Sequence, residues 1–303
     1  MELRDIEYFS VVAKHGHLGR AAEALGLSQS ALSKSLRRLE QEMQAKLVKR
    51  TPKGVELTEE GSTLLSHAHS LRASLDDVVR EVTDVRRGLA GHLRIGAGAG
   101  FFFHLLAAAC NALIRDAPNV ALRFREIGYG DAIQSLRSGE VDIAVRVIRD
   151  SPEHDLAQEH LYDDRYVVIA SVNHRLAGKE VVTLVDLAQE RWILSAPTSA
   201  ISRQLHGVFE KHGLPRPRVT VETGSPALRL PVVASSDVLG YTWASVARQA
   251  APHLRFAELD VKELALTFRV GVSYRKDAYL SPLAKRFIEI LKSTAREIGN
   301  VTK

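Results

Sequence analysis

Hydrophobic residues near the N-terminus recur at the spacing of short helices. Ala21, Ala22 and Leu25 fall on one side of a short predicted helix, which the pair Gly26-Leu27 interrupts. Ser28 stands where the next helix needs an N-cap, because its hydroxyl can accept a hydrogen bond from a free backbone amide. An apolar stripe then follows on one side of that helix, made of Leu32, Leu36 and Leu39. The opposite side is polar and carries no acid, and its members are Gln29, Ser30, Ser33, Lys34 and Arg37. The pattern predicts a helix-turn-helix whose second helix is the recognition helix.

The segments on either side complete a small domain. Residues 3–15 predict a first helix with an apolar face of Leu3, Ile6, Phe9, Val12 and Ala13. After the recognition helix, the short strands LVKR and VELT flank Thr51-Pro52-Lys53-Gly54, which suits a β-turn. This hairpin would be a wing. Arg50, Thr51 and Lys53 near its tip are candidates for contacts to phosphate or to a minor groove; the alternative is a solvated basic turn.

Positive charge is concentrated around these two elements. Residues 32–55 hold seven basic side chains against the two acids Glu40 and Glu42, and the seven are Lys34, Arg37, Arg38, Lys46, Lys49, Arg50 and Lys53. Such a patch neutralises phosphates, which supply most of the non-specific affinity for DNA. Glutamine and arginine can also pair bidentately with adenine and guanine in the major groove. The charge favours a DNA-binding helix-turn-helix over two ordinary surface helices of a bundle.

A long helix is predicted after Thr58, which stands at its N-cap with Glu59 and Glu60 next to the positive end of the helix dipole. Its apolar residues alternate in steps of four and three: Leu64, Ala68, Leu71, Leu75, Val78, Val82, Val85 and Leu89. That 3.5-residue repeat is typical of a coiled-coil seam, so we expect at least a dimer. Two recognition helices would then address two half-sites of an inverted repeat. His67 and His69 are two residues apart, point to different sides and make no metal site.

Beyond Gly91 the chain alternates short apolar strands with helices. HLRIGA, VALRFREI and VDIAVRV read as strands around the helices FFFHLLAAACNALIRDA and DAIQSLRSG, and residues 148–164 read as a crossover. YVVIAS, WILSA, RVTVET and LGYTW repeat the theme, and FRVGVSYR with SPLAKRFIEILKSTARE would return to the first unit. The alternation predicts parallel sheets covered by helices on both faces, in two α/β lobes.

The N-terminal 60 residues resemble the DNA-binding domain of LysR-type transcriptional regulators. The matching pieces are Ala21-Ala22, Ser28-Gln29, Ala31-Leu32-Ser33, Leu39-Glu40, Arg50-Thr51 and Leu57-Thr58 with Gly61. Three positions depart from the family pattern. Ser30 replaces the usual proline, Val48 stands where phenylalanine is common, and His17 replaces a serine that would cap its helix better.

The resemblance implies the whole architecture. A winged helix-turn-helix occupies residues 1–58, a linker and dimerisation helix with its hinge occupies 59–90, and an effector-binding domain resembling periplasmic binding proteins occupies 91–303. Lobe I would comprise about 91–161 and 269–303, and lobe II about 162–268. It also implies a tetramer of paired dimers, and RNA polymerase as a partner.

A small effector is expected between the lobes, at strand ends and helix N-termini. The segment Ala97 to Gly100 ends a strand and leaves amide groups that can receive an anion. The candidate effector-binding residues are Gly98, Ala99, Gly100, Phe101, Gly128, Tyr129, Arg146, Thr198, Ser199, Ile201, Thr223 and Trp243. Arg146 either clamps a carboxylate bidentately or forms a structural ion pair that bridges the lobes. We therefore expect an effector that is more often anionic than cationic.

Composition narrows the class of protein. The 303 residues are 45% hydrophobic and 25% charged, as in a soluble globular protein. The single cysteine, Cys110, favours a core role in a reducing cytoplasm, and no signal segment or 18-residue apolar stretch predicts export or a membrane span. IGAGAGF has Phe101 where a dinucleotide fingerprint needs glycine, and no other catalytic motif occurs, so we expect neither an enzyme nor a cofactor. A solute-binding protein is the other alternative, and the 90-residue N-terminal extension argues against it.

Overall fold

The computed structural model describes residues 2–52, 54–87, 91–128, 130–150 and 153–301. The chain divides into two compact units, Met1–Glu81 with Arg137–Glu140 and Val82–Leu136 with Val141–Lys303. Each unit has a hydrophobic core of its own, and each is described separately below.

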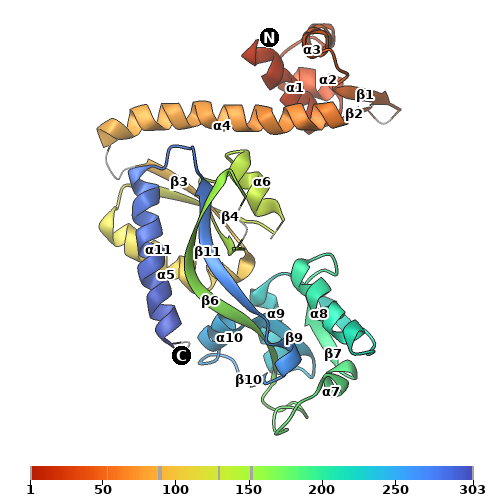
Figure 1. The fold of residues 1–303 in the computed structure, drawn as a ribbon, viewed down its shortest axis with the longest axis vertical. Helices are drawn as coiled ribbons and strands as arrows, with labels where there is room; N and C mark the ends of the chain where they lie inside the picture. Colours follow the sequence, from red (N-terminus) through yellow and green to blue (C-terminus); the bar gives the residue numbers. More distant parts are fainter. Residues whose placement is uncertain (1, 53, 88–90, 129, 151–152, 302–303) are drawn as a thin grey trace. The chain divides into compact units, whose positions relative to one another are not determined.

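The first unit contains the predicted winged helix-turn-helix. Its elements are α1 (Leu3–His15), α2 (Leu18–Ala24), α3 (Gln29–Met43), β1 (Val48–Thr51), β2 (Gly54–Leu57) and α4 (Glu59–Arg87) (Figure 1). Phe9, Val12, Leu32 and Leu39 are fully buried and form its core, to which the first turns of α4 contribute Ala68. The apolar stripes read from the sequence therefore face one another.

Three side chains cap the helices of this unit. The Ser28 hydroxyl accepts the Ala31 amide at 3.2 Å, and the Thr58 hydroxyl accepts the Gly61 amide at 2.9 Å. His17 caps α2 by accepting the Gly19 amide through Nδ1 at 3.1 Å. The imidazole thus replaces the serine of the family pattern without loss of the capping hydrogen bond.

The second unit is built on one mixed sheet. Its first half contains β3 (Gly91–Ala97), β4 (Val120–Glu126) and β5 (Ile143–Val147), and its second half β7 (Arg191–Leu194), β8 (Arg218–Glu222), β9 (Leu239–Trp243) and β10 (Phe256–Leu259). The long strands β6 (Leu156–Ser171) and β11 (Thr267–Arg275) pair antiparallel and carry the two halves (Figure 1). The strand order is β4-β3-β5-β11-β6-β9-β7-β8, with β10 paired to β6.

The prediction of parallel sheets is confirmed for three strands in each half, whereas β6, β10 and β11 pair antiparallel with their neighbours. β3 pairs parallel with β4 and β5, and β7 pairs parallel with β8 and β9. Residues 148–164, expected to be a crossover, instead include the start of the 16-residue strand β6. Polar and charged residues interleaved with the buried Leu161 and Tyr162 obscured that strand, whose pairing partner β11 lies far away in the sequence.

Helices cover both faces of each half. In the first half, α5 (Leu105–Asp116) and α11 (Pro282–Val301) pack together over one face, and α6 (Asp131–Arg137) covers the other. In the second half, α7 (Leu184–Ala188) and α8 (Ala200–Lys211) lie on one side and α9 (Pro226–Ser235) and α10 (Ala244–Ala250) on the other. The helix expected to begin at Phe101 starts instead as a 3-10 turn, η1 (Ala99–Phe102), and a second 3-10 turn, η2 (Lys262–Leu264), precedes β11.

Candidate DNA-binding surface and effector site

The polar face of α3 is open to solvent, as the sequence predicts. Gln29, Ser30, Lys34 and Arg37 are exposed, whereas Ser33 is half-buried. The hydroxyls of Ser28 and Ser30 lie 3.0 Å apart and order the first turn of the helix. These side chains form a row of donors and acceptors on a rigid helix, which is the chemistry that base edges require.

Two of the seven basic residues of this region serve the fold. Arg38 binds the buried carboxylate of Asp5 through Nε at 2.9 Å and Nη2 at 2.5 Å, and Lys46 pairs with Glu40 at 2.9 Å. Lys34, Arg37 and Lys49 are exposed and form no ion pair with an acid of the described residues. The charge available to a polyanion is therefore smaller than the sequence count, and it lies on α3 and the wing.

The wing is fixed to the body of the domain by close backbone contacts. In the β1–β2 hairpin Arg50 is opposite Val55, and its Nη2 donates to the Ser33 hydroxyl of α3 at 3.3 Å. The Val55 amide donates to Gly16 at 2.8 Å, and a Cβ on Gly54 would lie 2.2 Å from that same carbonyl oxygen. Thr51 is half-buried, and its hydroxyl has no hydrogen-bond partner among the described residues. The predicted phosphate contact Lys53 lies outside the described residues.

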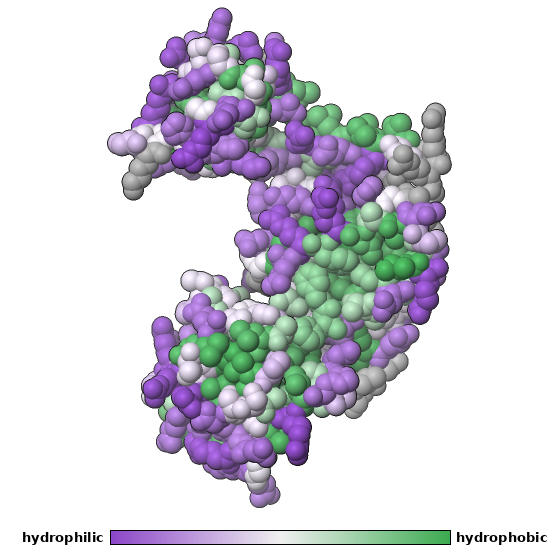
Figure 2. Space-filling model, turned by 180° about the vertical axis from the view of Figure 1, so that it is seen from behind, coloured by the Kyte–Doolittle hydropathy of each residue, from purple (hydrophilic) through white to green (hydrophobic). Residues whose placement is uncertain are grey.

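The heptad positions of α4 divide into two groups. Ala68 is buried and Leu64 half-buried in the core of the helix-turn-helix, so Ala68 has almost no surface left for the predicted contact with a partner helix. The next four are exposed, with Leu71 at 40%, Leu75 at 47%, Val78 at 58% and Val82 at 68%. Val85 lies outside the residues whose side chains are described. Figure 2 shows hydrophobic side chains gathered along α4. The unpaired apolar seam begins at Leu71.

The predicted effector residues form two groups in the second unit. In the first, the rings of Phe101 and Trp243 lie 5.7 Å apart, and a Cβ on Gly100 would lie 2.6 Å from Trp243 Cδ1. Trp243 also stacks on Tyr166 at 4.2 Å. An aromatic cluster therefore joins η1 to β6 and β9. The Phe101 amide donates to Gly98 at 3.0 Å, so that amide is not free for an anion as expected.

Arg146 is occupied by partners within its own half of the sheet. It is buried, and it donates to Glu153 at 2.8 Å and to the Ser273 hydroxyl at 3.0 Å. Arg146 was expected either to clamp a carboxylate ligand or to form an ion pair between the lobes. The structure has an ion pair, but Glu153 lies in the segment before β6, so the pair does not bridge the lobes. Gly128 is exposed and its carbonyl accepts the Asp131 amide, while Tyr129 lies outside the described residues.

The second group lies at the carboxyl ends of β7 and β8. Ser199 caps α8, its hydroxyl accepting the Ser202 amide at 3.2 Å, and Ile201 packs against the core beneath. Thr198 is exposed and its carbonyl accepts a hydrogen bond from Arg203. The carbonyl of Thr223 accepts a hydrogen bond from Arg229 at 2.7 Å.

Arg229 is the residue that the sequence reading missed. It lies on α9 and is only 5% exposed, yet no carboxylate among the described residues pairs with it. Its other hydrogen bonds go to the Ser195 hydroxyl at 2.8 Å and the Tyr241 carbonyl at 3.2 Å, while its Nε has no partner in the part of the chain that the structure describes. Burial lowers the pKa of its guanidinium. The signal in the sequence was a single cation in the apolar helix PALRLPVVAS.

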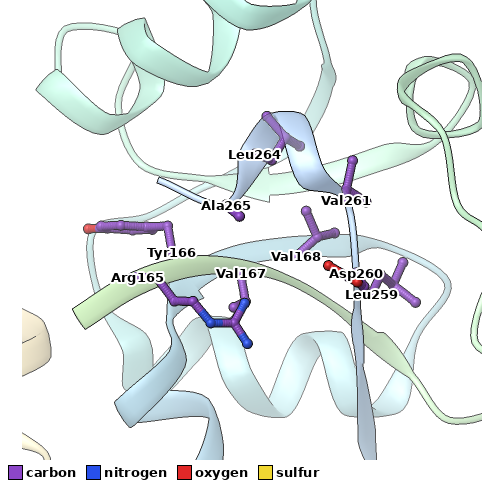
Figure 3. Close-up of a pocket in the computed structure, with 9 residues that line it drawn as sticks. All are labelled: Arg165, Tyr166, Val167, Val168, Leu259, Asp260, Val261, Leu264 and Ala265. Atoms are coloured by element: carbon purple, nitrogen blue, oxygen red, sulfur yellow. The ribbon is translucent and has the colours of Figure 1, made fainter. Parts of the chain in front are cut away.

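A shallow depression lies beside this region without forming a ligand cavity. Figure 3 shows Tyr166 and Val168 of β6 facing Leu264 and Ala265, while Arg165 and Val167 point to the other face of the strand. The depression has no enclosed space for a water-sized molecule. Among the described residues, no group of three or more His, Cys, Asp or Glu side chains could hold a metal ion, and no helix is long and apolar enough to cross a membrane.

A winged helix-turn-helix linked to a two-lobed α/β domain defines a ligand-responsive DNA-binding protein. Residues 3–62 match the family described as bacterial regulatory helix-turn-helix protein, lysR family, and residues 86–296 match the LysR substrate binding domain. The chain belongs to the LysR family of transcriptional regulators: it is a DNA-binding regulator with an effector-binding domain and not an enzyme.

Similar proteins match more than nine-tenths of the chain. The HTH-type transcriptional regulator ShiR of Corynebacterium glutamicum (strain R) is 31% identical over 284 residues, which are 91% of this chain and 93% of the relative. The regulator AlsR of Bacillus subtilis (strain 168) is 27% identical over 293 residues, 96% of this chain and 95% of the relative. The solved structure of full-length CbnR complexed with its target DNA has a TM-score of 0.65 at 18% identity, covering 97% of this chain and all of that one. At 18% identity, the similarity to the CbnR structure shows a shared fold only.

Proposed function

We propose that α3 reads the major groove of an inverted-repeat operator, with Gln29 and Arg37 at base edges and Lys34 at phosphate. The observation that carries this proposal is the exposed face of α3, on which Lys34 and Arg37 have no acidic partner among the described residues. The serines 28, 30 and 33 and the wing residues Arg50, Thr51 and Lys53 complete the surface. Because Arg50 is bonded to Ser33, the wing and the recognition helix would engage DNA as one rigid unit.

Two subunits pair through α4 in this proposal. The exposed positions Leu71, Leu75, Val78 and Val82 continue a 3.5-residue repeat, and an exposed apolar row on a 29-residue helix favours a partner helix. Two-fold pairing would present two copies of α3 to two half-sites. Effector domains would pair these dimers further into a tetramer, with RNA polymerase as a further partner of the DNA-bound assembly in the cytoplasm.

The effector in this proposal is a small anionic metabolite that binds between the two halves of the α/β sheet. Support comes from the α8 N-terminus and from the cluster of Phe101, Tyr166 and Trp243 at the junction of the halves. Binding would shift the effector domains, change the spacing of the DNA-bound dimers and so alter the DNA bend. A coupling free energy of about 1–3 kcal/mol is the usual size of such an effect.

Gel shifts with upstream DNA of the native genome, with and without candidate acids, test the proposal. We expect salt-sensitive binding of a dimer or tetramer to particular fragments, and a changed pattern when an acid binds. Fluorescence titration provides the parallel measurement. Trp243 is half-buried at the junction and should respond, whereas Trp192 is fully buried and bonded to the Leu187 carbonyl, so it should not. Binding of neutral or cationic compounds alone would refute the anionic effector.

A further inference from the structure

Arg229 is a buried cation surrounded only by neutral oxygen atoms in the part of the chain described. Its Nη2 donates to the Ser195 hydroxyl and the Thr223 carbonyl, and its Nη1 donates to the Tyr241 carbonyl. A buried charge without a counter-charge costs several kcal/mol, roughly, in proteins. Arg146, the other buried arginine considered, already has Glu153 as its counter-charge. Arg229 therefore has the stronger need for an anion.

Its hydrogen-bonding capacity is also incomplete. The guanidinium carries five N–H groups, and Nε, which is buried, has no acceptor. An unsatisfied buried donor destabilises a protein, because its hydrogen bond to water is lost and not replaced. Ser195 and Thr223 directly follow β7 and β8, and Tyr241 lies within β9, so the three acceptors fix the side chain but leave this donor open.

The N-terminus of α8 converges on the same place. The Ser202 hydroxyl donates to the Ser195 carbonyl at 2.9 Å, so the residue that binds Arg229 is tied directly to the first turn of this 12-residue helix. The Ser199 hydroxyl satisfies the Ser202 amide. The amides of Ala200 and Ile201 have no acceptor among the described residues, and such amides at a helix start favour an anion.

We propose that Arg229 binds the carboxylate of a small organic acid, together with the Ser195 hydroxyl and the α8 N-terminus. This inference rests on the proposed function, because it names the chemistry of the effector and the residue that selects it. The planar guanidinium matches a carboxylate in two-point geometry, and Ser195 turns its hydroxyl from arginine acceptor to ligand donor. Arg229 donates to the Tyr241 carbonyl, and the Tyr241 ring lies 5.0 Å from that of Tyr166, which in turn lies 4.2 Å from that of Trp243. The body of the acid would thus lie toward the aromatic cluster, where binding alters the environment of Trp243.

Benzoate and its neutral isostere benzamide are the probes that test this assignment. With the full-length protein, we expect millimolar benzoate to raise the melting temperature and change Trp243 fluorescence, and benzamide to do neither. Arg229→Met should weaken the benzoate response at least about tenfold, corresponding to roughly 1.4 kcal/mol. Arg229→Lys keeps the charge but loses the two-point hydrogen bonding of the guanidinium, so it should retain part of the benzoate response. Arg191→Met is the matched control, since Arg191 pairs with Asp237 at the surface of the same half.

The outcomes separate this inference from the function on which it rests. Equal responses to benzoate and benzamide, no response to benzoate, or an undiminished response in Arg229→Met would overturn the assignment, even if the protein still binds its operator in gel shifts. Loss of operator binding by the wild-type protein would instead overturn the proposed function. Should Arg229→Met fail to fold, Ser195→Ala carries the test: it keeps the arginine, and we expect about fivefold to tenfold weaker benzoate binding from one lost hydrogen bond.

Discussion

Arg38 of the recognition helix holds Asp5 of α1 in a two-point ion pair, with Nε and Nη2 donating to the two carboxylate oxygens. The Ser35 hydroxyl donates to the same carboxylate at 2.5 Å. Asp5 is buried, and the hydrogen bonds from Arg38 lower the pKa of its carboxyl. This contact fixes the recognition helix on its support, and it removes one cation from the surface offered to DNA.

Asp5→Asn should loosen the packing of α1 on α3. The Arg38 side chain is 44% exposed and can be hydrated when its partner is lost. We therefore expect the free energy of unfolding to fall by only about 1–3 kcal/mol. Hydrogen exchange of the α1 and α3 amides in the full-length protein measures it. Because the native pKa of Asp5 lies below its unfolded value, its contribution is complete above that value and declines as pH falls through the native pKa. If the stability of the wild type below pH 4 varied with pH no more than that of Asp5→Asn, this role of Asp5 would be wrong.

Gln29→Ala and Lys34→Gln should separate base reading from phosphate binding. Gln29→Ala is expected to lower affinity for the operator by about 1–3 kcal/mol while affinity for random DNA stays the same. Lys34→Gln should weaken all sequences alike and reduce the slope of log affinity against log salt by about 0.9. Gel shifts over a range of salt concentration measure both. Equal losses on random DNA for the two variants would show that this division of roles is wrong. From its predicted place at the tip of the wing, Lys53→Ala should also weaken binding to all sequences and reduce the salt dependence.

Val78→Asp should prevent pairing of the long helices. The Val78 side chain is 58% exposed, so an aspartate there costs the folded subunit little, but it would bury a charge in the proposed helix pair. Sedimentation at micromolar concentration should show smaller assemblies and unchanged helix content. Asp76→Asn is the control, because Asp76 is exposed on the same helix at a position away from the seam and its flanks. Unchanged assembly of Val78→Asp would place the dimer contact elsewhere.

His104 should make the effector domain less stable in mild acid. Burial lowers the pKa of His104 to about 4 from an ordinary value of 6.5, and its Nδ1 has no partner. The unfolded chain therefore binds the extra proton first, so stability falls as pH drops from about 6.5 toward 4. At pH 5 the expected loss is up to about 2 kcal/mol relative to pH 7. His104→Phe removes the titrating group, and its denaturant midpoint should vary less between pH 7 and 5; an identical pH dependence would exclude His104 as the cause.

The elements that pattern and capping could predict are those whose signals are local. The helix-turn-helix, the wing and α4 follow from the N-caps Ser28 and Thr58 and from stripes such as Leu32, Leu36 and Leu39. The start of β6 could not be read, because polar and apolar residues alternate irregularly before Asp163 and a non-local partner, β11, makes them a strand. The sequence also could not show that the apolar row of α4 packs into the helix-turn-helix core up to Ala68 and is exposed beyond it. A heptad pattern predicts which positions are apolar but not which part of the protein covers each one.

The effector residues show the same limit. The loops at Gly100 and Ser199 were predictable from strand ends and helix starts, and Phe101 and Trp243 do meet. The roles of Arg146 and Arg229 depend on which side chains the fold brings beside them. Glu153 lies seven residues from Arg146, whereas Ser195 lies 34 residues from Arg229, and no spacing rule distinguishes a paired arginine from an unpaired one.

In the proposed complex, two copies of α3, held together by α4, lie along duplex DNA. Footprinting of the full-length protein on fragments that it retains from its own genome tests this most directly. We predict protection of two symmetry-related half-sites whose centres are separated by whole turns of about 10–10.5 base pairs. A protein that stays monomeric and retains no fragment at low salt would contradict the account.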